Sequence, residues 1–127
     1  MPQESIKNVK LLIVDHADLI RESIDSKNFD ITVKKVVTGK DCLLELDPFK
    51  PDFVLSNLML PELDGLSLAR LIRGKYSHIR LLLMTDIPFS PSLQKVARLE
   101  GVEAMLFAPI SPQRLLQYIH VKGLSPS

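Results

Sequence analysis

The sequence has 127 residues, the usual size of a single domain that can bury its own hydrophobic core. Its 16 basic and 15 acidic residues give a formal net charge of +1, which argues against nucleic-acid binding by charge and against a polybasic membrane anchor. Apolar stretches such as Leu81–Met84 are far shorter than the roughly 20 residues that span a bilayer. The single cysteine, Cys42, cannot form an internal disulfide, so we expect a cytoplasmic protein.

Short apolar runs alternate with helical patterns along the chain. Lys10–Asp15 is an apolar run that ends in an acid, typical of a strand buried on both faces, and a helix is predicted from Asp18, as its cap, to Lys27. The later predicted elements are, in order, strand Ile31–Val37, helix Lys40–Leu46, strand Asp52–Ser56, helix Leu63–Arg73 ended by Gly74, strand Ile79–Thr85, helix Pro91–Glu100 ended by Gly101, strand Ala104–Phe107 and helix Ser111–Val121 capped by Ser111.

This alternation predicts an α/β domain with right-handed βαβ crossovers and a parallel sheet covered by helices on both faces. We divide the chain into an N-terminal extension (1–9), the domain (10–122) and a tail or start of a linker (123–127). Ligands of such sheets bind at the carboxyl ends of the strands. The candidate site residues therefore follow the predicted strands: Asp15, His16, Asn57, Thr85, Asp86 and Ala108.

These positions resemble the receiver domain of two-component response regulators, the CheY-like family. Val14–Asp18 is similar to the acidic motif after the family's first strand, and Pro51–Gly65 to its third strand with the following Pro-x-x-Asp-Gly turn. Leu81–Thr85 resembles the fourth strand with its signalling threonine, and Gly101–Pro109 the segment that normally ends in Lys-Pro. The resemblance runs from Lys10 to Val121. It implies a flavodoxin-like (βα)5 fold with strand order 2-1-3-4-5.

The family's phosphoryl chemistry uses three kinds of group. An aspartate after the third strand attacks the phosphoryl donor, a pair of acids after the first strand holds Mg²⁺, and a lysine before the fifth-strand proline neutralises the developing charge. The resemblance places Asn57 at the acceptor position, His16 at the second acid and Ala108 at the lysine. A carboxamide is a poor nucleophile, imidazole suits softer metals than Mg²⁺, and a methyl group carries no charge.

These departures predict an atypical receiver that is not an enzyme and is not phosphorylated by the usual aspartate chemistry. We expect no catalytic residue, no cofactor, and weak or absent Mg²⁺ binding at the remnant pocket, where Asp86 would also repel a phosphoryl group. Thr85 is then expected to make a strand-end hydrogen bond, and Met105, at the family's switch position, to fill core space. An engineered block would explain Asn57 but not His16 and Ala108, which favours natural degeneration.

The expected role is a protein-interaction or dimerisation module. The resemblance implies a contact face for a partner or a second copy made of Leu93–Glu100, Ala104–Phe107 and Arg114–His120, with a possible output domain after the tail, and with no direct nucleic-acid or membrane binding. The main alternative is a small-ligand or metal sensor that uses the remodelled pocket around Asp15, His16, Asn57 and Asp86. A third reading, phosphorylation at Asp15 or His16 instead, requires a geometry that the sequence does not indicate.

Overall fold

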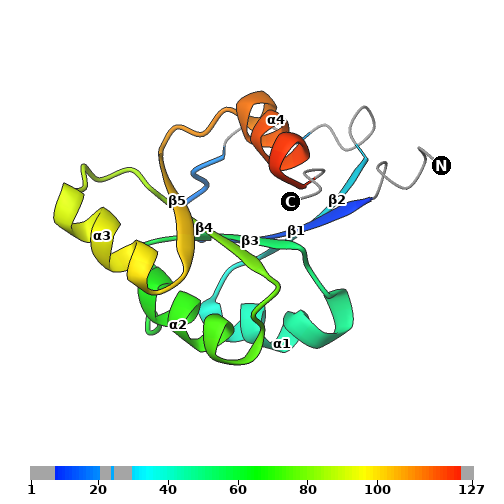
Figure 1. Ribbon diagram of the computed structural model, residues 1–127, viewed down its shortest axis with the longest axis horizontal. Coiled ribbons are helices and arrows are strands. Elements are labelled where there is room, and N and C mark those ends of the chain that lie inside the picture. The colour runs from blue at the N-terminus through cyan, green and yellow to red at the C-terminus, as the bar shows by residue number, and fades with distance from the viewer. Residues whose placement is uncertain (1–7, 21–23, 25–29, 124–127) are drawn as a thin grey trace.

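The computed structural model describes residues 8–20, 24 and 30–123. Five strands in this part form one parallel sheet in the order β2-β1-β3-β4-β5, which confirms the predicted fold class. In Figure 1, α4 covers one face of the sheet, and α1 and α2 cover the other. The elements are β1 (Val9–Val14), β2 (Ile31–Val36), α1 (Gly39–Phe49), β3 (Phe53–Asn57), α2 (Gly65–Lys75), β4 (Arg80–Thr85), α3 (Pro91–Leu99), β5 (Val102–Phe107) and α4 (Pro112–Gly123).

The central strands are apolar throughout because helices cover both of their faces. In β1, Leu11 and Ile13 pack in the cluster that includes α4, whereas Leu12 and Val14 pack in the cluster that includes α1 and α2. Burying one such side chain contributes about 1.5–3 kcal/mol to folding. The two clusters hold the sheet between its helical layers and fix the strand ends that carry the candidate site. None of the described helices is long and apolar enough to cross a membrane.

Helix α2 begins directly beside the end of β3. The Asp64 carboxylate caps the helix by accepting a hydrogen bond from the Ser67 backbone N–H at 2.8 Å. A Cβ on Gly65 would lie 2.7 Å from the Asn57 carbonyl oxygen, so only glycine permits this approach. The Pro61–Gly65 turn therefore places α2 against the candidate acceptor residue. The predicted Ser111 cap of α4 is also present, because the Ser111 Oγ accepts from the Arg114 N–H at 3.3 Å.

Several predicted helix boundaries differ from the structure: α1 continues past Leu46 to Phe49, and α2 begins at Gly65 rather than Leu63. Gly74 does not end α2 but lies inside it, because the helix continues to Lys75 and the Arg73 guanidinium donates to carbonyl oxygens just beyond the helix, those of Ser77 at 2.7 Å and Ile79 at 2.9 Å. Asp18 is not a helix cap in the described part: its φ is 58°, and bends lie on either side of it, at residues 16–17 and 19–20. Most of the predicted helix to residue 27 lies outside the described residues.

Gly101→Ala is expected to lower the free energy of unfolding by about 1–3 kcal/mol, because its φ of 92° disfavours any side chain. The added Cβ would also meet the Arg73 Nε at 2.5 Å. Gly74→Ala is the matched control: no atom lies within 4 Å of its added Cβ, and alanine in a helix is stabilising by up to about 1 kcal/mol. Urea unfolding followed by circular dichroism measures both changes; a neutral or stabilising Gly101→Ala would contradict the assigned backbone.

Cys42 is expected to resist iodoacetamide in the folded protein and to react fully in denaturant. Its side chain is fully buried in α1, and burial raises the pKa of the thiol to about 12. Since the thiolate is the reactive form, both access and ionisation are suppressed. Intact mass after alkylation at mildly alkaline pH gives the readout, and rapid labelling of the native chain would show that α1 does not pack as described.

Candidate functional site

The carboxyl ends of β1, β3 and β4 bring three polar side chains together in the interior. Asp15, Asn57 and Thr85 are 2%, 3% and 0% exposed, although polar groups of this kind are buried only where they are hydrogen-bonded. Ala108, directly after β5, is also buried. His16 and Asp86 are exposed, so the structure does not bring them into the buried cluster.

Asp15 accepts three hydrogen bonds from N–H groups. Its Oδ1 accepts from the Ala17 backbone at 2.9 Å and from Asn57 Nδ2 at 2.9 Å, and its Oδ2 accepts from the Leu19 backbone at 2.7 Å. Burial alone would raise the pKa of Asp15, but these hydrogen bonds, together with the nearby charge of Lys35, lower it below its usual value. The carboxylate therefore stays ionised and holds the loop after β1.

The Asn57 carboxamide uses both of its polar atoms. Its Nδ2 donates to Asp15, and its Oδ1 accepts from the Met59 backbone N–H at 2.8 Å. The reverse orientation would point the amide oxygen at a carboxylate and the NH₂ group at an N–H, so the orientation is fixed by its neighbours. The side chain ties the end of β3 to the end of β1.

Thr85 makes local hydrogen bonds at the end of β4. Its Oγ1 accepts from the Ile87 backbone at 3.1 Å, and its carbonyl oxygen accepts from the Ala108 N–H at 2.8 Å. Met105 is partly buried and packs against the apolar cluster shared by α1 and α2. The Ala108-Pro109 peptide bond that follows β5 is cis.

The residues of this cluster do not fit the Mg²⁺ ion that the resemblance implies. Mg²⁺ requires octahedral oxygen ligands, usually including anionic ones, and Asp15 is the one carboxylate in the buried cluster. The two oxygens of Asp15 already accept three hydrogen bonds. Asn57 directs its NH₂ group, which cannot bind a cation, at Asp15. Within the described ranges, no group of three or more His, Cys, Asp or Glu side chains is placed to hold a metal. The metal-sensor alternative thus stays a prediction without a described ligand set.

Two features near the site were not predicted. Lys35, at the end of β2, forms an ion pair with Asp18 at 3.7 Å and lowers the pKa of Asp15 through its charge. The Ile110 N–H donates to the Leu19 carbonyl oxygen at 3.3 Å, which ties the loop before α4 to the loop that Asp15 holds. The Lys35 contact follows from the parallel pairing of β1 with β2, which brings the ends of the two strands together. No spacing in the sequence indicates the contact between Ile110 and Leu19.

Comparison with known proteins gives one consistent family. Residues 11–120 match the response regulator receiver domain family. The chain is 29% identical to the response regulator GacA of Pseudomonas aeruginosa, covering 93% of this chain and 65% of that protein, and 28% identical to the Regulator of RpoS of Escherichia coli, covering 93% and 35%. The chain thus spans less than two thirds of the length of these relatives. The structure of chemotaxis protein CheY4 of Vibrio cholerae has a similar fold, with a TM-score of 0.77, 20% identity and coverage of 91% and 98%.

Proposed function

This chain belongs to the response regulator receiver domain family, and we propose that it works in two-component signalling through protein contacts, without phosphorylation at Asn57. The observation that carries the proposal is the hydrogen bond from Asn57 Nδ2 to Asp15 Oδ1 at 2.9 Å. An aspartate acceptor would present an anionic oxygen for attack. Asn57 presents a neutral amide, and both of its polar atoms are engaged by neighbours.

The electrostatics of the pocket also disfavour an incoming phosphoryl group. Phosphoryl transfer depends on positive charge placed at the developing anion. The buried Ala108 supplies none, while Asp15 remains ionised and Asp86 adds an exposed acid directly after β4. Lys35, the nearby cation, is half exposed and pairs with Asp18. A dianionic phosphoryl group in this pocket would therefore be repelled by the Asp15 carboxylate, with little positive charge nearby to offset the repulsion. This supports the proposal that the module is not an enzyme.

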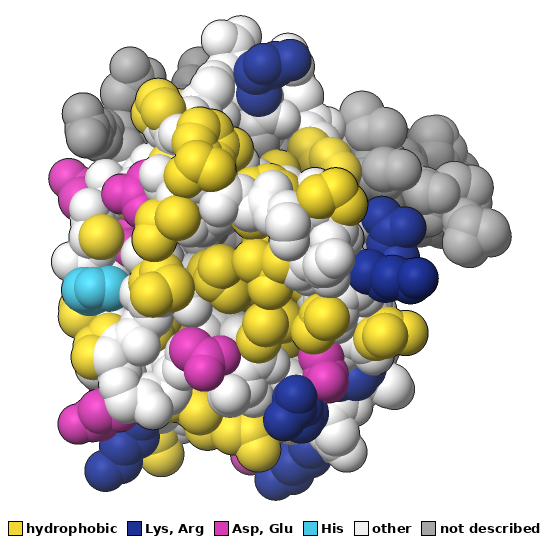
Figure 2. Space-filling model, turned by 90° about the vertical axis from the view of Figure 1, so that its left-hand side faces the viewer, with side chains coloured by type: hydrophobic (Ala, Val, Ile, Leu, Met, Phe, Trp, Pro, Cys, Tyr) yellow, Lys and Arg dark blue, Asp and Glu magenta, His cyan; other side chains and the backbone are white. Residues whose placement is uncertain are grey.

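The proposed contact face is formed by α3, β5 and α4. Three large apolar side chains on this part of the chain are exposed: Val96 by 45%, Leu99 by 80% and Phe107 by 54%. Figure 2 looks onto the side that carries α3, where apolar side chains gather across the middle and basic side chains lie around the margins. Exposed apolar groups of this kind are typical of protein-contact surfaces. We place this contact in the cytoplasm, with an output domain as one candidate partner.

The test compares the protein with and without acetyl phosphate and Mg²⁺. We expect the backbone amide NMR signals of Thr85, Asp86 and Ala108 to keep their positions, and the molar mass from light scattering to stay unchanged. Shifts confined to these residues, or a change in association state, would show that the pocket still responds to phosphoryl donors.

The contact face has its own test. Val96→Ser and Phe107→Ser are expected to weaken self-association or capture by a full-length partner, whichever the protein shows. Leu44→Ser is the matched control, because Leu44 is an apolar residue on α1, away from the proposed face, and is at least as exposed as Val96 and Phe107. Equal effects of all three substitutions would remove support for this face.

A further inference from the structure

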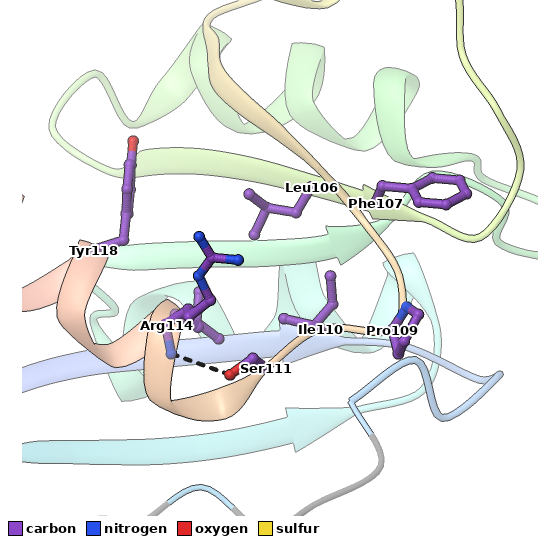
Figure 3. A pocket seen from close by; sticks show the side chains of 8 residues that line it. Leu106, Phe107, Pro109, Ile110, Ser111, Arg114 and Tyr118 are labelled. Carbon is purple, nitrogen blue, oxygen red and sulfur yellow. Dashed lines mark hydrogen bonds between the residues drawn. The ribbon is translucent and has the colours of Figure 1, made fainter.

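A hollow of about 300 Å³ lies where β5 leads into α4, outside the buried polar cluster. Its described lining is mainly apolar, and Figure 3 shows the side chains of β5 and α4 that face it. The volume is at the lower end of the range for ligand pockets, so it suits one bulky side chain rather than a cofactor. The lining residues are Leu106, Phe107, Pro109, Ile110, Ser111, Arg114, Leu115 and Tyr118.

The walls of the hollow are held by hydrogen bonds that need no ligand. The Tyr118 hydroxyl donates to Glu103 Oε2, and the Arg80 guanidinium donates to both oxygens of the same carboxylate at 2.8 and 2.9 Å. Burial and this carboxylate raise the pKa of Tyr118 to about 12, so its hydroxyl remains a donor. On the opposite wall, Ile110 is tied to Leu19 through its backbone. A preformed hollow binds at a lower entropic cost than one that must form on binding.

Arg114 supplies the charge of the hollow. Among the described residues that line it, Arg114 alone is charged, and none of the ion pairs within the described ranges involves its guanidinium. Figure 3 shows the guanidinium on the same side of α4 as Tyr118, directed toward β5. A guanidinium beside an apolar wall, with no acidic partner in the part of the chain that the structure describes, is suited to a carboxylate carried next to an apolar group.

We propose that this hollow seats one apolar side chain of a protein partner, with a carboxylate on a neighbouring residue of the partner pairing with Arg114. The inference rests on the proposed function as a protein-contact module and adds the chemistry of the segment that the module recognises. Charge complementarity selects an acidic and apolar segment, and the exposed Phe107 at the edge of the hollow extends the apolar contact.

The test uses two short probes, acetyl-Asp-Phe-Leu-amide and acetyl-Asn-Phe-Leu-amide, titrated into the ¹⁵N-labelled protein and followed by amide NMR shifts. We expect saturable shifts centred on residues 106–115. The aspartate peptide should bind about two- to five-fold more tightly than the asparagine peptide, the gain of one partly exposed ion pair. Arg114→Gln should abolish this difference. Arg98→Gln, which removes the same charge from α3, should preserve it.

Shifts that are absent or centred elsewhere, equal affinities for the two peptides, or a difference that survives Arg114→Gln would each overturn the proposal. These outcomes separate it from the proposed function. If the peptides fail to bind while the spectra stay insensitive to acetyl phosphate and Mg²⁺, the hollow is not the docking point, and the phosphorylation-independent receiver stands. If the spectra respond to acetyl phosphate while the peptides bind, the hollow is a docking point, and the phosphorylation-independent function is wrong.

Discussion

Asp15→Asn is expected to lower the free energy of unfolding by at least about 3 kcal/mol at neutral pH, because hydrogen bonds to a buried charged group contribute about 1.5–3 kcal/mol each and an unsatisfied buried donor costs 1–3. The wild-type carboxylate accepts from Ala17, Leu19 and Asn57. An amide at position 15 offers one oxygen to these donors and turns an NH₂ group toward the others. The loop after β1 would lose the anchor that sets its path.

The pH dependence of the wild type follows from the same carboxylate. The folded-state pKa of Asp15 lies below the usual aspartate value, so its contribution to stability is present above the unfolded-state pKa and is lost as the pH falls through the folded-state pKa. Asp15→Asn should lack this component of acid destabilisation.

Urea unfolding of both proteins from neutral to acidic pH measures the two effects. Asp86→Asn is the matched control, since Asp86 is an exposed acid at the same end of the sheet and should change stability by no more than about 0.5 kcal/mol. If Asp15→Asn were as mild as this control, Asp15 would not be the anchor of the site.

Asn57→Asp is expected to cost about 2 kcal/mol at neutral pH, because two buried carboxylates at hydrogen-bonding distance cannot both ionise without raising one pKa by one to three units. The substitution replaces the donor that now faces Asp15 Oδ1 at 2.9 Å with a second anion. A carboxyl whose pKa is raised in the folded state binds a proton more tightly there than in the unfolded chain. The deficit relative to the wild type should therefore be small at acidic pH and grow as the pH rises through the raised pKa.

Thermal unfolding of Asn57→Asp, with Asn57→Ala as the control, separates the effect of the added negative charge on stability from the effect of losing the amide hydrogen bonds. The alanine variant loses the bonds to Asp15 and Met59 without adding an anion, so its deficit should depend far less on pH. Mg²⁺ should raise the melting temperature of Asn57→Asp and leave those of the wild type and Asn57→Ala unchanged. A fully stable Asn57→Asp at neutral pH without divalent cations would mean that residues 15 and 57 do not face each other.

The fold could be predicted because the central strands are buried on both faces. A run such as Leu81–Met84 has no polar face that could be exposed to water, so both of its faces must be covered. Because such runs alternate with helical patterns along the chain, a parallel sheet with helices on both faces is the expected arrangement. The meeting of Asp15, Asn57 and Thr85 could also be predicted, since the carboxyl ends of parallel strands converge. The Gly74 prediction was wrong because α2 continues through this glycine to Lys75, and the segment after the helix is held by the Arg73 guanidinium, which donates to the Ser77 and Ile79 carbonyl oxygens. A local glycine rule does not consider such side-chain contacts.

The details of the site could not be predicted because they depend on side-chain contacts between distant segments. Sequence spacing identifies Asn57 as a changed acceptor, but only the fold shows that its NH₂ group points at Asp15. The hollow beside Arg114 arises from the geometry of β5 and α4, and the Glu103 contact that fixes Tyr118 joins a strand to a helix. No periodicity encodes either arrangement.

The most direct test of the account is the intact mass of the wild-type chain after incubation with acetyl phosphate and Mg²⁺, beside a receiver that carries the usual acceptor aspartate. With an amide at position 57 bonded to Asp15, the account predicts a phosphoryl adduct on the control receiver and none on this chain. An adduct of one phosphoryl group on this chain, lost on mild alkaline treatment as an acyl phosphate would be, would contradict it.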